Sequence, residues 1–279
     1  MGFILNTLVL TAITLVAVEG VFLLTGMTGM FSFGQAGFAA IGAYVAVSLQ
    51  RNLHLALLPS LLGAMIGAAA VAVVIGYPTT RLRSDQFALA TLGFSLGMSS
   101  FLDLFASGGA TGIAAIPLIA KGWEITTFAV LSVWVVVRIK RSRHGRNLLA
   151  VRDDPIAASA LGISPHAARV EVFVIASALA GLSGGLTAFY IGYIGPEMFT
   201  VAGSLSYVII VFFGGLESVT GSVLATFILI FLPQALAFAQ GWQAVIYSAA
   251  VLVTILVSPQ GLVGGRELSL RMFARRGVQ

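Results

Sequence analysis

Residue types that could support catalysis are few in this chain, and they are scattered. Its 279 residues include no cysteine, which excludes a disulfide or a thiolate metal site. Its three histidines, His54, His144 and His166, form no metal triad and no Ser-His-Asp set. A nucleotide-binding P-loop is absent as well, because neither of the two lysines, Lys121 and Lys140, follows a glycine. The sequence therefore predicts no enzyme, and any ATP would be hydrolysed by another protein.

The stretch GMTGMFSFGQAGFAAIGAY, residues 26–44, combines glycines with polar side chains inside an apolar region. A broken helix at membrane depth is tolerated only where the freed backbone lines a cavity or is buried in protein. We interpret the stretch as such a break, whose amides could meet a carboxylate and whose rings could meet an aliphatic side chain. The residues predicted to line a solute pathway are Glu19, Phe31, Ser32, Phe33, Gly34 and Gln35. The alternative is a crowded helix crossing, in which glycine permits close approach and the hydroxyls bond back to their own helix.

Two acids, Glu19 and Asp103, fall within apolar runs. Acids at membrane depth are costly unless they are paired or wetted. Asp103 lies near an expected outer end, where solvation is the simpler explanation, and Glu19 lies deeper. Both acids also leave open an alternative of another class, a proton-coupled secondary transporter, because such a protein needs a titratable group within its pathway.

The composition predicts an all-α integral membrane protein. Hydrophobic residues make up 58% of the chain and charged residues 9%, and the mean hydropathy is +1.02. Apolar runs long enough to cross a bilayer recur, so we expect a polytopic bundle of about nine transmembrane helices, with eight or ten as alternatives. The first run begins at Phe3 without a basic flank or cleavage site and is expected to be a retained span. The expected spans are 3–24, 30–49, 55–77, 87–105, 122–138, 171–194, 198–215, 220–239 and 243–258.

Charge sets the expected orientation and the domains. Residues 138–169 form one long polar segment, and placing it and the C-terminus in the cytoplasm leaves 13 of the 15 basic residues on that side. The chain then divides into a transmembrane domain, residues 1–265, which includes a cytoplasmic loop at 139–170, and a basic cytoplasmic tail, residues 266–279. The high isoelectric point is explained by this asymmetry, so we expect no nucleic-acid partner.

Within the polar segment, DDPIAASALGIS predicts a short helix over residues 154–162. It has acids and a proline at its start, good helix formers in the middle and a glycine at its end. Its small residues would allow another protein to approach closely, whereas an interfacial helix lying on lipid headgroups is the alternative for the basic residues upstream. We therefore expect this helix to dock a partner protein.

The spacing of Ala157, Ala158 and Gly162 resembles the coupling loop of ABC-importer permeases, which contacts their ATPase. The whole chain resembles the branched-chain amino acid permease family of the LivM type. One departure is Ile156, which stands where the general loop motif has glutamate, and the usual Leu-Pro ending is missing. The matching stretches run in the family's order and include TGMTGMFSFGQAGFAAIGAY at 25–44, TTRLRSDQFALATLGF at 79–94, GGATGI at 108–113, GRNLLAVRDDPIAASALGI at 145–163, FFGGLESVTGSVLA at 212–225 and SPQGLVGG at 258–265.

This resemblance implies the ABC-importer permease fold and a set of partners. It implies one permease subunit in a bacterial inner membrane, surrounded by lipid and paired with a second, related permease. Two cytoplasmic subunits would bind ATP and magnesium, and an external solute-binding protein would deliver the solute. Branched-chain amino acids are the first solutes implied, with urea, short amides or other amino acids as alternatives. The low charge of the spans independently favours a small zwitterionic or neutral solute. The residues implied in coupling are Arg152, Asp153, Asp154, Ala157, Ala158 and Gly162.

Glycines spaced four apart also predict close helix packing. The three pairs are Gly63 and Gly67, Gly93 and Gly97, and Gly181 and Gly185. Such pairs place small residues on one helix face, where neighbouring backbones can touch.

Overall fold

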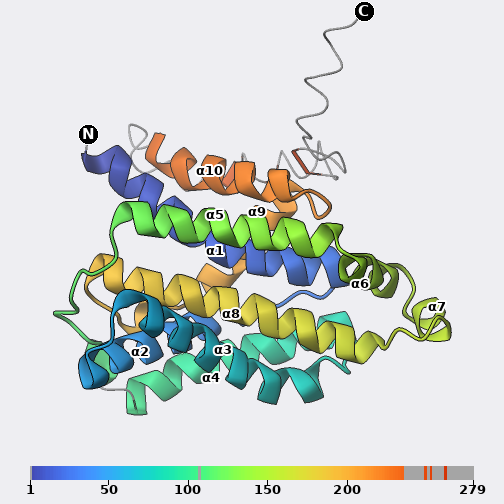
Figure 1. Cartoon of the computed structure of the whole chain (residues 1–279), viewed down its shortest axis with the longest axis horizontal. Helices are drawn as coiled ribbons and strands as arrows, with labels where there is room; N and C mark the ends of the chain where they lie inside the picture. Colours follow the sequence, from blue (N-terminus) through green and yellow to red (C-terminus); the bar gives the residue numbers. More distant parts are fainter. Residues whose placement is uncertain (1, 106–107, 236–247, 250–251, 253–260, 263–279) are drawn as a thin grey trace, which may run out of the picture. The chain divides into compact units, whose positions relative to one another are not determined.

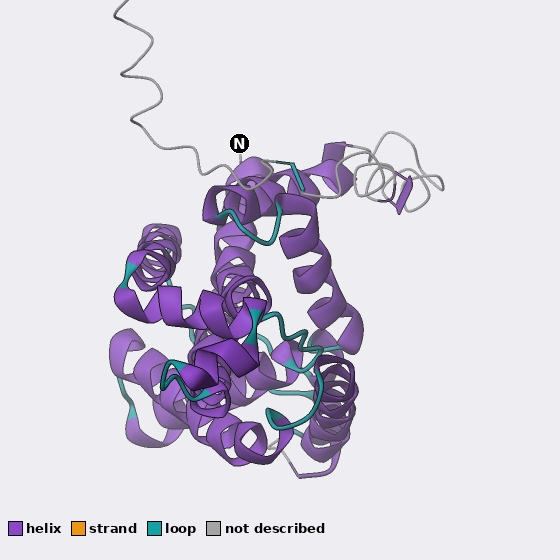
Figure 2. Ribbon diagram, turned by 90° about the vertical axis from the view of Figure 1, so that its right-hand side faces the viewer, coloured by secondary structure: helices purple, strands orange, loops and turns teal. Residues whose placement is uncertain are grey.

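The computed structural model describes residues 2–105, 108–235, 248–249, 252 and 261–262. This part of the chain is helical, with no strand beyond an isolated bridge between Ile113 and Ile194 (Figures 1 and 2). Two compact units are present, residues 1–208 and 209–279, and we describe each by itself. The first unit contains most of the predicted functional residues.

The long helices coincide with the predicted spans. They are α1 Gly2–Thr28, α2 Gln35–Leu53, α3 Leu57–Thr79, α4 Ser84–Phe105, α5 Gly122–Arg141, α8 Pro165–Ile191, α9 Val201–Gly214 and α10 Val219–Ala235. The short elements are η1 Gly109–Thr111, α6 Arg143–Asp153, α7 Pro155–Ala160 and η2 Pro196–Met198. The ninth predicted span, 243–258, lies almost wholly outside the described residues, as does the tail at 266–279.

Six of the described helices are long and apolar enough to cross a membrane. They are α1, α3, α4, α5, α8 and the α9 region, so a helical membrane bundle is confirmed while the expected count of nine is not. Helix α2 is 19 residues long but ends in the polar run Gln50, Arg51 and Asn52, which lowers its hydropathy. Helix α10 has an apolar stretch, Val219–Pro233, that is shorter than a full span.

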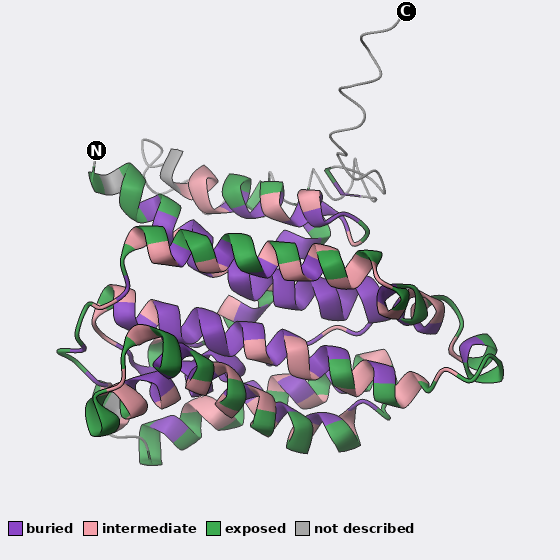
Figure 3. Cartoon of the chain, in the orientation of Figure 1, coloured by how far each residue is buried: buried purple, intermediate pink, exposed green. Residues whose placement is uncertain are grey.

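Helices α1 and α8 form the buried centre of the first unit (Figure 3). Helix α8 packs against α1, α2 and α3, and α5 lies along α1. Small residues make this contact close: a Cβ at Gly20 of α1 would lie 2.7 Å from the carbonyl oxygen of Ala176 in α8. In the same way, Gly184 of α8 leaves no space for a Cβ beside the backbone of Ala39 in α2. Packing of backbone on backbone thus holds the centre of the bundle together.

The glycine pairs behave in two ways. Gly63 and Gly67 of α3 face Leu49 and Val45 of α2, and Gly181 and Gly185 of α8 face α3, as close packing requires. The prediction is wrong for Gly93 and Gly97 of α4, because a Cβ at either position would have no described atom within 4 Å. The spacing alone cannot tell a face turned toward the bundle from a face turned outward.

Hydrogen bonds gather the helix ends of the first unit into two opposite rims. At one rim, Arg152 of α6 bonds the end of α1, Ser84 at the start of α4 bonds Gly29, and Thr80 after α3 meets His166 at the start of α8. We call this the coupling rim. The other rim, the outer rim, is tied by the bonds Arg51 to Ala114, Tyr190 to Asn6 and Tyr193 to Thr111. The long helices of this unit therefore alternate in direction, as the predicted topology requires.

In the second unit, the loop between α9 and α10 carries the motif FFGGLESVTGSVLA. Ser218 begins α10, where its hydroxyl oxygen accepts a hydrogen bond from the amide of Gly221 at 3.1 Å. The amide of Leu262 donates to the carbonyl oxygen of Phe213 at 2.9 Å. This bond joins one residue from each of two stretches on which the family resemblance rests, 212–225 and 258–265.

Candidate functional site

The glycine-rich stretch contains a true interruption between two helices. Helix α1 ends at Thr28, helix α2 begins at Gln35, and Gly29 adopts a φ of +68°, a conformation that favours glycine. The Ser84 hydroxyl donates to the carbonyl oxygen of Gly29 at 3.0 Å, and the amide of Phe33 donates to Thr91, seven residues further along α4. At 1.5 Å per residue, the segment 29–34 therefore runs about 10 Å into the bundle from the coupling rim. Residues 29–34 thus form a non-helical segment inside the bundle, as the predicted break requires, and we call this segment the break.

Hydroxyl groups satisfy part of the freed backbone of the break. Thr91 accepts from the amide of Phe33 at 3.1 Å, and Ser204 of α9 accepts from the amide of Ala36 at 2.8 Å. Both hydroxyls are buried. The amides of Phe33 and Ala36 thus have protein partners, so these two amides are not available to a solute carboxylate. Sequence reasoning missed Thr91 and Ser204 because they lie far from the break along the chain.

The side chain of Gln35 has no partner among the described residues. It is fully buried at the first position of α2, and neither its Oε1 nor its Nε2 accepts or donates a hydrogen bond there. A buried amide without partners is costly in free energy, and both polar atoms of Gln35 could bind a small molecule. Ser32 and Gly34 are buried beside it, and the Ser32 hydroxyl accepts from the amide of Gly34 at 3.3 Å.

The remaining predicted pathway residues differ in their surroundings. Phe31 and Phe33 are half-buried, whereas Glu19 is fully buried within α1. Phe38, which flanks the break, stacks on Phe94 of α4 with ring centroids 4.6 Å apart and meets Phe173 of α8 edge-on at 5.3 Å. Phe38 is thus a packing residue between three helices.

The predicted coupling helix is present as α7, shorter than expected. Asp154 caps it, because its Oδ1 accepts from the amides of Ile156 and Ala157 at 2.8 and 3.0 Å. At the other end Gly162 has a φ of +81°, and the amide of Ile163 donates to the carbonyl oxygen of Ala158. The sequence signals for both ends are therefore confirmed. Helix α6, which precedes α7 and is capped by Ser142, had not been expected as a separate helix.

The surface of α7 is more apolar than its alanines suggested. Ile156 is 84% exposed and Leu161 is 78% exposed, although both are large aliphatic residues. Ala157 is also exposed, but Ala158 is buried, so it cannot contribute to a docking surface as expected. Exposed aliphatic side chains outside the bundle can contact another protein or a membrane surface. In Figure 1, α6 and α7 extend beyond the ends of α5 and α8.

Arg152 points toward the bundle, where it joins helix α6 to the last turn of α1, directly before the break. Its Nη1 donates to the carbonyl oxygen of Gly26 at 2.7 Å, in the last turn of α1. A cation at this place also interacts favourably with the helix dipole. Arg152 was expected among the docking residues, and the structure gives it this inward contact. Asp153, the last residue of α6, and Asp154, which caps α7, are exposed.

The histidines and Asp103 lie outside any catalytic arrangement. The His144 Nε2 is 3.4 Å from a carboxylate oxygen of Glu171, and His166 Nδ1 is 3.2 Å from the Thr80 hydroxyl. In the described part of the chain, no three histidines or acids gather as a metal site. Asp103 is exposed near the end of α4, as its expected solvation requires.

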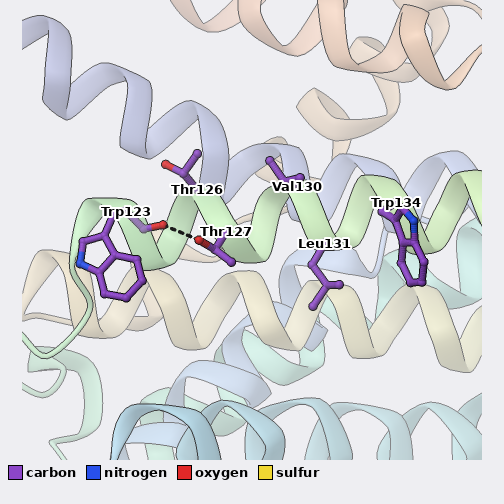
Figure 4. Close-up of a pocket in the computed structure, with 6 residues that line it drawn as sticks. All are labelled: Trp123, Thr126, Thr127, Val130, Leu131 and Trp134. Atoms are coloured by element: carbon purple, nitrogen blue, oxygen red, sulfur yellow. Dashed lines mark hydrogen bonds between the residues drawn. The ribbon is translucent and has the colours of Figure 1, made fainter.

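A groove of about 590 Å³ runs along the outward face of α5 (Figure 4). Its wall includes Trp123, Val130, Leu131 and Trp134, and the Thr127 hydroxyl donates back to the carbonyl oxygen of Trp123 at 2.8 Å. No charged residue is among its described lining residues, so a polar solute would find little to bind here. The groove suits lipid or an apolar protein surface.

At the outer rim, a tyrosine and a glutamate lie between α8 and α9. The Tyr193 hydroxyl donates to Glu197 Oε1 at 2.6 Å and also approaches the carbonyl oxygen of Thr111 at 3.3 Å. The hydrogen bond to Glu197 raises the pKa of Tyr193 above its usual value, because ionising the phenol would remove the donated proton beside a carboxylate.

Six described helices long enough to span a membrane, a non-helical segment between α1 and α2, and the capped short helix α7 at one rim define a polytopic helical membrane protein. The comparisons with known proteins agree. The family model described as "Branched-chain amino acid transport system / permease component" matches residues 3–258, and the chain therefore belongs to this family, whose members act as permease subunits of ABC importers. No solved structure matches.

Three relatives illustrate this similarity. The branched-chain amino acid permease LivM of Escherichia coli K12 is 29% identical over 97% of this chain and 72% of its own length. LivH of the same organism is 26% identical over 87% of this chain and 88% of its own. The probable LivH protein of Methanocaldococcus jannaschii is 25% identical over 85% and 84%. These relatives are transport permeases, which agrees with a role other than that of an enzyme.

Proposed function

We propose that this chain imports a small zwitterionic solute, with branched-chain amino acids as the first candidates. The observation that carries the proposal is the capped helix α7, which presents Ile156 and Leu161 to a partner and is tied through Arg152 to the break. The names of the relatives support the solute class. Urea, short amides and other amino acids remain the alternative solutes.

The family membership supports the proposed partners. The sequence has no P-loop, and we propose that two separate cytoplasmic subunits bind ATP and magnesium and dock on α7. A second, related permease and lipid would cover the exposed apolar faces, including the α5 groove. A solute-binding protein would meet the outer rim.

The proposed topology has nine spans with the coupling rim and the C-terminus in the cytoplasm of a bacterium. Arg81, Arg83, Arg138 and Arg169 all lie near helix ends at the coupling rim, which supports this side as the positive one. The N-terminal end of α1 then lies outside, beside the end of α8, as the bond from Tyr190 to Asn6 requires.

Coupling would proceed from the ATPase to the break. Closure of the ATPase pair would displace α7 and, with it, α6. The hydrogen bond of Arg152 would transmit this displacement to the last turn of α1, directly before the break. The break carries Gln35, whose unpartnered amide would bind the polar end of a passing solute. Glu19, buried in α1, would respond to the same movement.

The test is uptake of labelled leucine by proteoliposomes that hold this chain with its partner permease, ATPases and binding protein. We expect uptake that requires ATP and that is abolished by Gly162→Pro and by Ile156→Asp, while membrane insertion is retained. Asn147→Asp, which adds a charge at an exposed position of α6, would control for added charge at the same rim. Uptake driven by a proton gradient without ATPase, or normal transport in both α7 variants, would overturn the proposal.

A further inference from the structure

The outer rim contains a pocket that is separate from the break. It encloses about 360 Å³ between α2, α4 and the loop that carries Ile113. Its lining residues are Tyr44, Val45, Ser48, Leu49, Leu102 and Ile113, together with an aromatic ring at the end of α4. A volume of this size lies at the lower end of the range for small-molecule sites. It suits an aliphatic side chain of a few carbons and excludes large solutes.

The pocket has a polar group that the protein leaves unpaired. Tyr44 is only 8% exposed, and its hydroxyl has no hydrogen-bond partner among the described residues. Buried hydroxyls without partners are uncommon in folded proteins. The other hydroxyl of the lining, that of Ser48, belongs to an exposed residue, so the Tyr44 hydroxyl is the buried polar group that would orient a ligand.

Charges of both signs flank the pocket. The carboxylates of Glu197 and Asp103 both interact electrostatically with the Tyr44 phenol. On α2, Ser48 and Arg51 follow Tyr44 at spacings of four and three residues, so all three share one helix face. The Arg51 Nη2 already donates to the carbonyl oxygen of Ala114 at 2.9 Å, which holds the guanidinium at the rim and leaves its other donors for a ligand.

We infer that this outer pocket is the first binding site for the solute on the permease, and that its ligand is an aliphatic α-amino acid. The aliphatic side chain lies among Val45, Leu49 and Leu102. The ammonium group is bound by Glu197 and Asp103, with the Tyr44 hydroxyl as an acceptor, and the carboxylate is bound by Arg51. This inference rests on the proposed function, because it names the place and orientation of the imported solute.

The pocket leads inward along the contact between α2 and α4. Gly37, two turns before Tyr44 on the same face, closes this contact: a Cβ there would lie 3.1 Å from the Phe94 ring of α4. Gly34 lies just as close to Thr91, with a Cβ 3.0 Å from its carbonyl oxygen. The structure thus has an open pocket at the outer rim and a closed contact between the pocket and the break.

The absence of cysteine gives a direct test. Ser48 is exposed, so Ser48→Cys introduces the only thiol of the chain without disturbing the core. In the assembled transporter, we would measure the rate at which a membrane-impermeant maleimide labels this chain, with and without leucine. We expect leucine to protect the thiol, and 3-methylbutylamine and 4-methylpentanoate, which lack the carboxylate and the ammonium respectively, to require at least tenfold higher concentrations. Asn52→Cys, an exposed position nearer the end of α2, is the control that leucine should not protect.

A second variant tests whether leucine is bound by charged groups or only by the apolar wall of the pocket. Adding Glu197→Gln to Ser48→Cys should raise the half-protecting concentration of leucine about tenfold, because a charge-assisted hydrogen bond is replaced by a neutral one. Failure of leucine to protect, or equal protection by the two analogues, would overturn the inference. The readout needs no ATP. Protection without ATP-dependent leucine uptake would therefore support the pocket while refuting the proposed transport activity.

Discussion

The bond between Arg152 and Gly26 offers the sharpest test of how motion reaches the break. Replacing Arg152 with glutamine removes a charge-assisted hydrogen bond of 2.7 Å and the favourable interaction of a cation with the end of α1. A hydrogen bond to a charged group contributes about 1.5–3 kcal/mol, and Arg152 is half-buried, so we take the lower end. About 1.4 kcal/mol corresponds to a factor of ten, and we therefore expect the solute transported per ATP hydrolysed to fall about tenfold.

The assay is the ratio of leucine imported to ATP hydrolysed in proteoliposomes with the complete set of subunits. Arg146→Gln is the matched control, because Arg146 is exposed on the same helix α6. We expect Arg152→Gln to assemble with the ATPases and hydrolyse ATP while importing less solute, and Arg146→Gln to keep the normal ratio. A normal ratio in Arg152→Gln would refute the reasoning. Loss of ATPase binding in this variant would also refute it, since Arg152 would then be a docking residue.

Three further predictions concern other parts of the first unit. Replacing Gln35 with leucine removes an unpartnered buried amide, so we expect the free energy of unfolding to rise by about 1–3 kcal/mol. Uptake of labelled leucine should fall in the same variant. Unchanged uptake would show that Gln35 does not line the pathway. Gly184→Ala should lower the melting temperature in detergent, because its Cβ would overlap the backbone of α2. Gly93→Ala should raise the melting temperature, because no described atom lies near this position and alanine has the better helix propensity. Shifts of the same sign in the two variants would contradict this packing. The phenol of Tyr193 should ionise above pH 10, and its bond to Glu197 should add stability below that pH and lose its effect as the pH rises through the raised pKa. The difference in absorbance at 295 nm between the parent protein and Tyr193→Phe, followed as a function of pH, measures the ionisation of the Tyr193 phenol. In Glu197→Gln, the pKa of Tyr193 should return toward 10.

Local signals in the sequence predicted the elements well. Apolar runs located the long helices, and the aspartate, proline and glycine around residues 154–162 located both ends of α7, because caps and hydropathy depend on neighbours in the chain. The break at Gly29 was found for the same reason: a positive φ and a loss of helix are properties of a few consecutive residues.

Contacts between distant residues were not predictable in this way. The partners of the break, Thr91 and Ser204, lie in other helices, and only the packed bundle brings their hydroxyls to the amides of Phe33 and Ala36. Arg152 looked like one more charge of the polar segment, since its contact with Gly26 spans 126 residues. Exposure of Ile156 and burial of Ala158 likewise depend on how α7 is presented, which composition does not reveal.

The exposed pair Ile156 and Leu161 also bears on the life of the subunit in the cell. In the proposed topology, a chain inserted before its ATPase arrives would display two aliphatic side chains to the cytosol, one on the six-residue helix α7 and one at its C-cap. Chaperones and proteases recognise such surfaces, so an orphan copy should be degraded faster than an assembled one. Synthesis of the ATPase would then set how much permease accumulates, and the two residues proposed to dock the ATPase would also keep the subunits in fixed proportion.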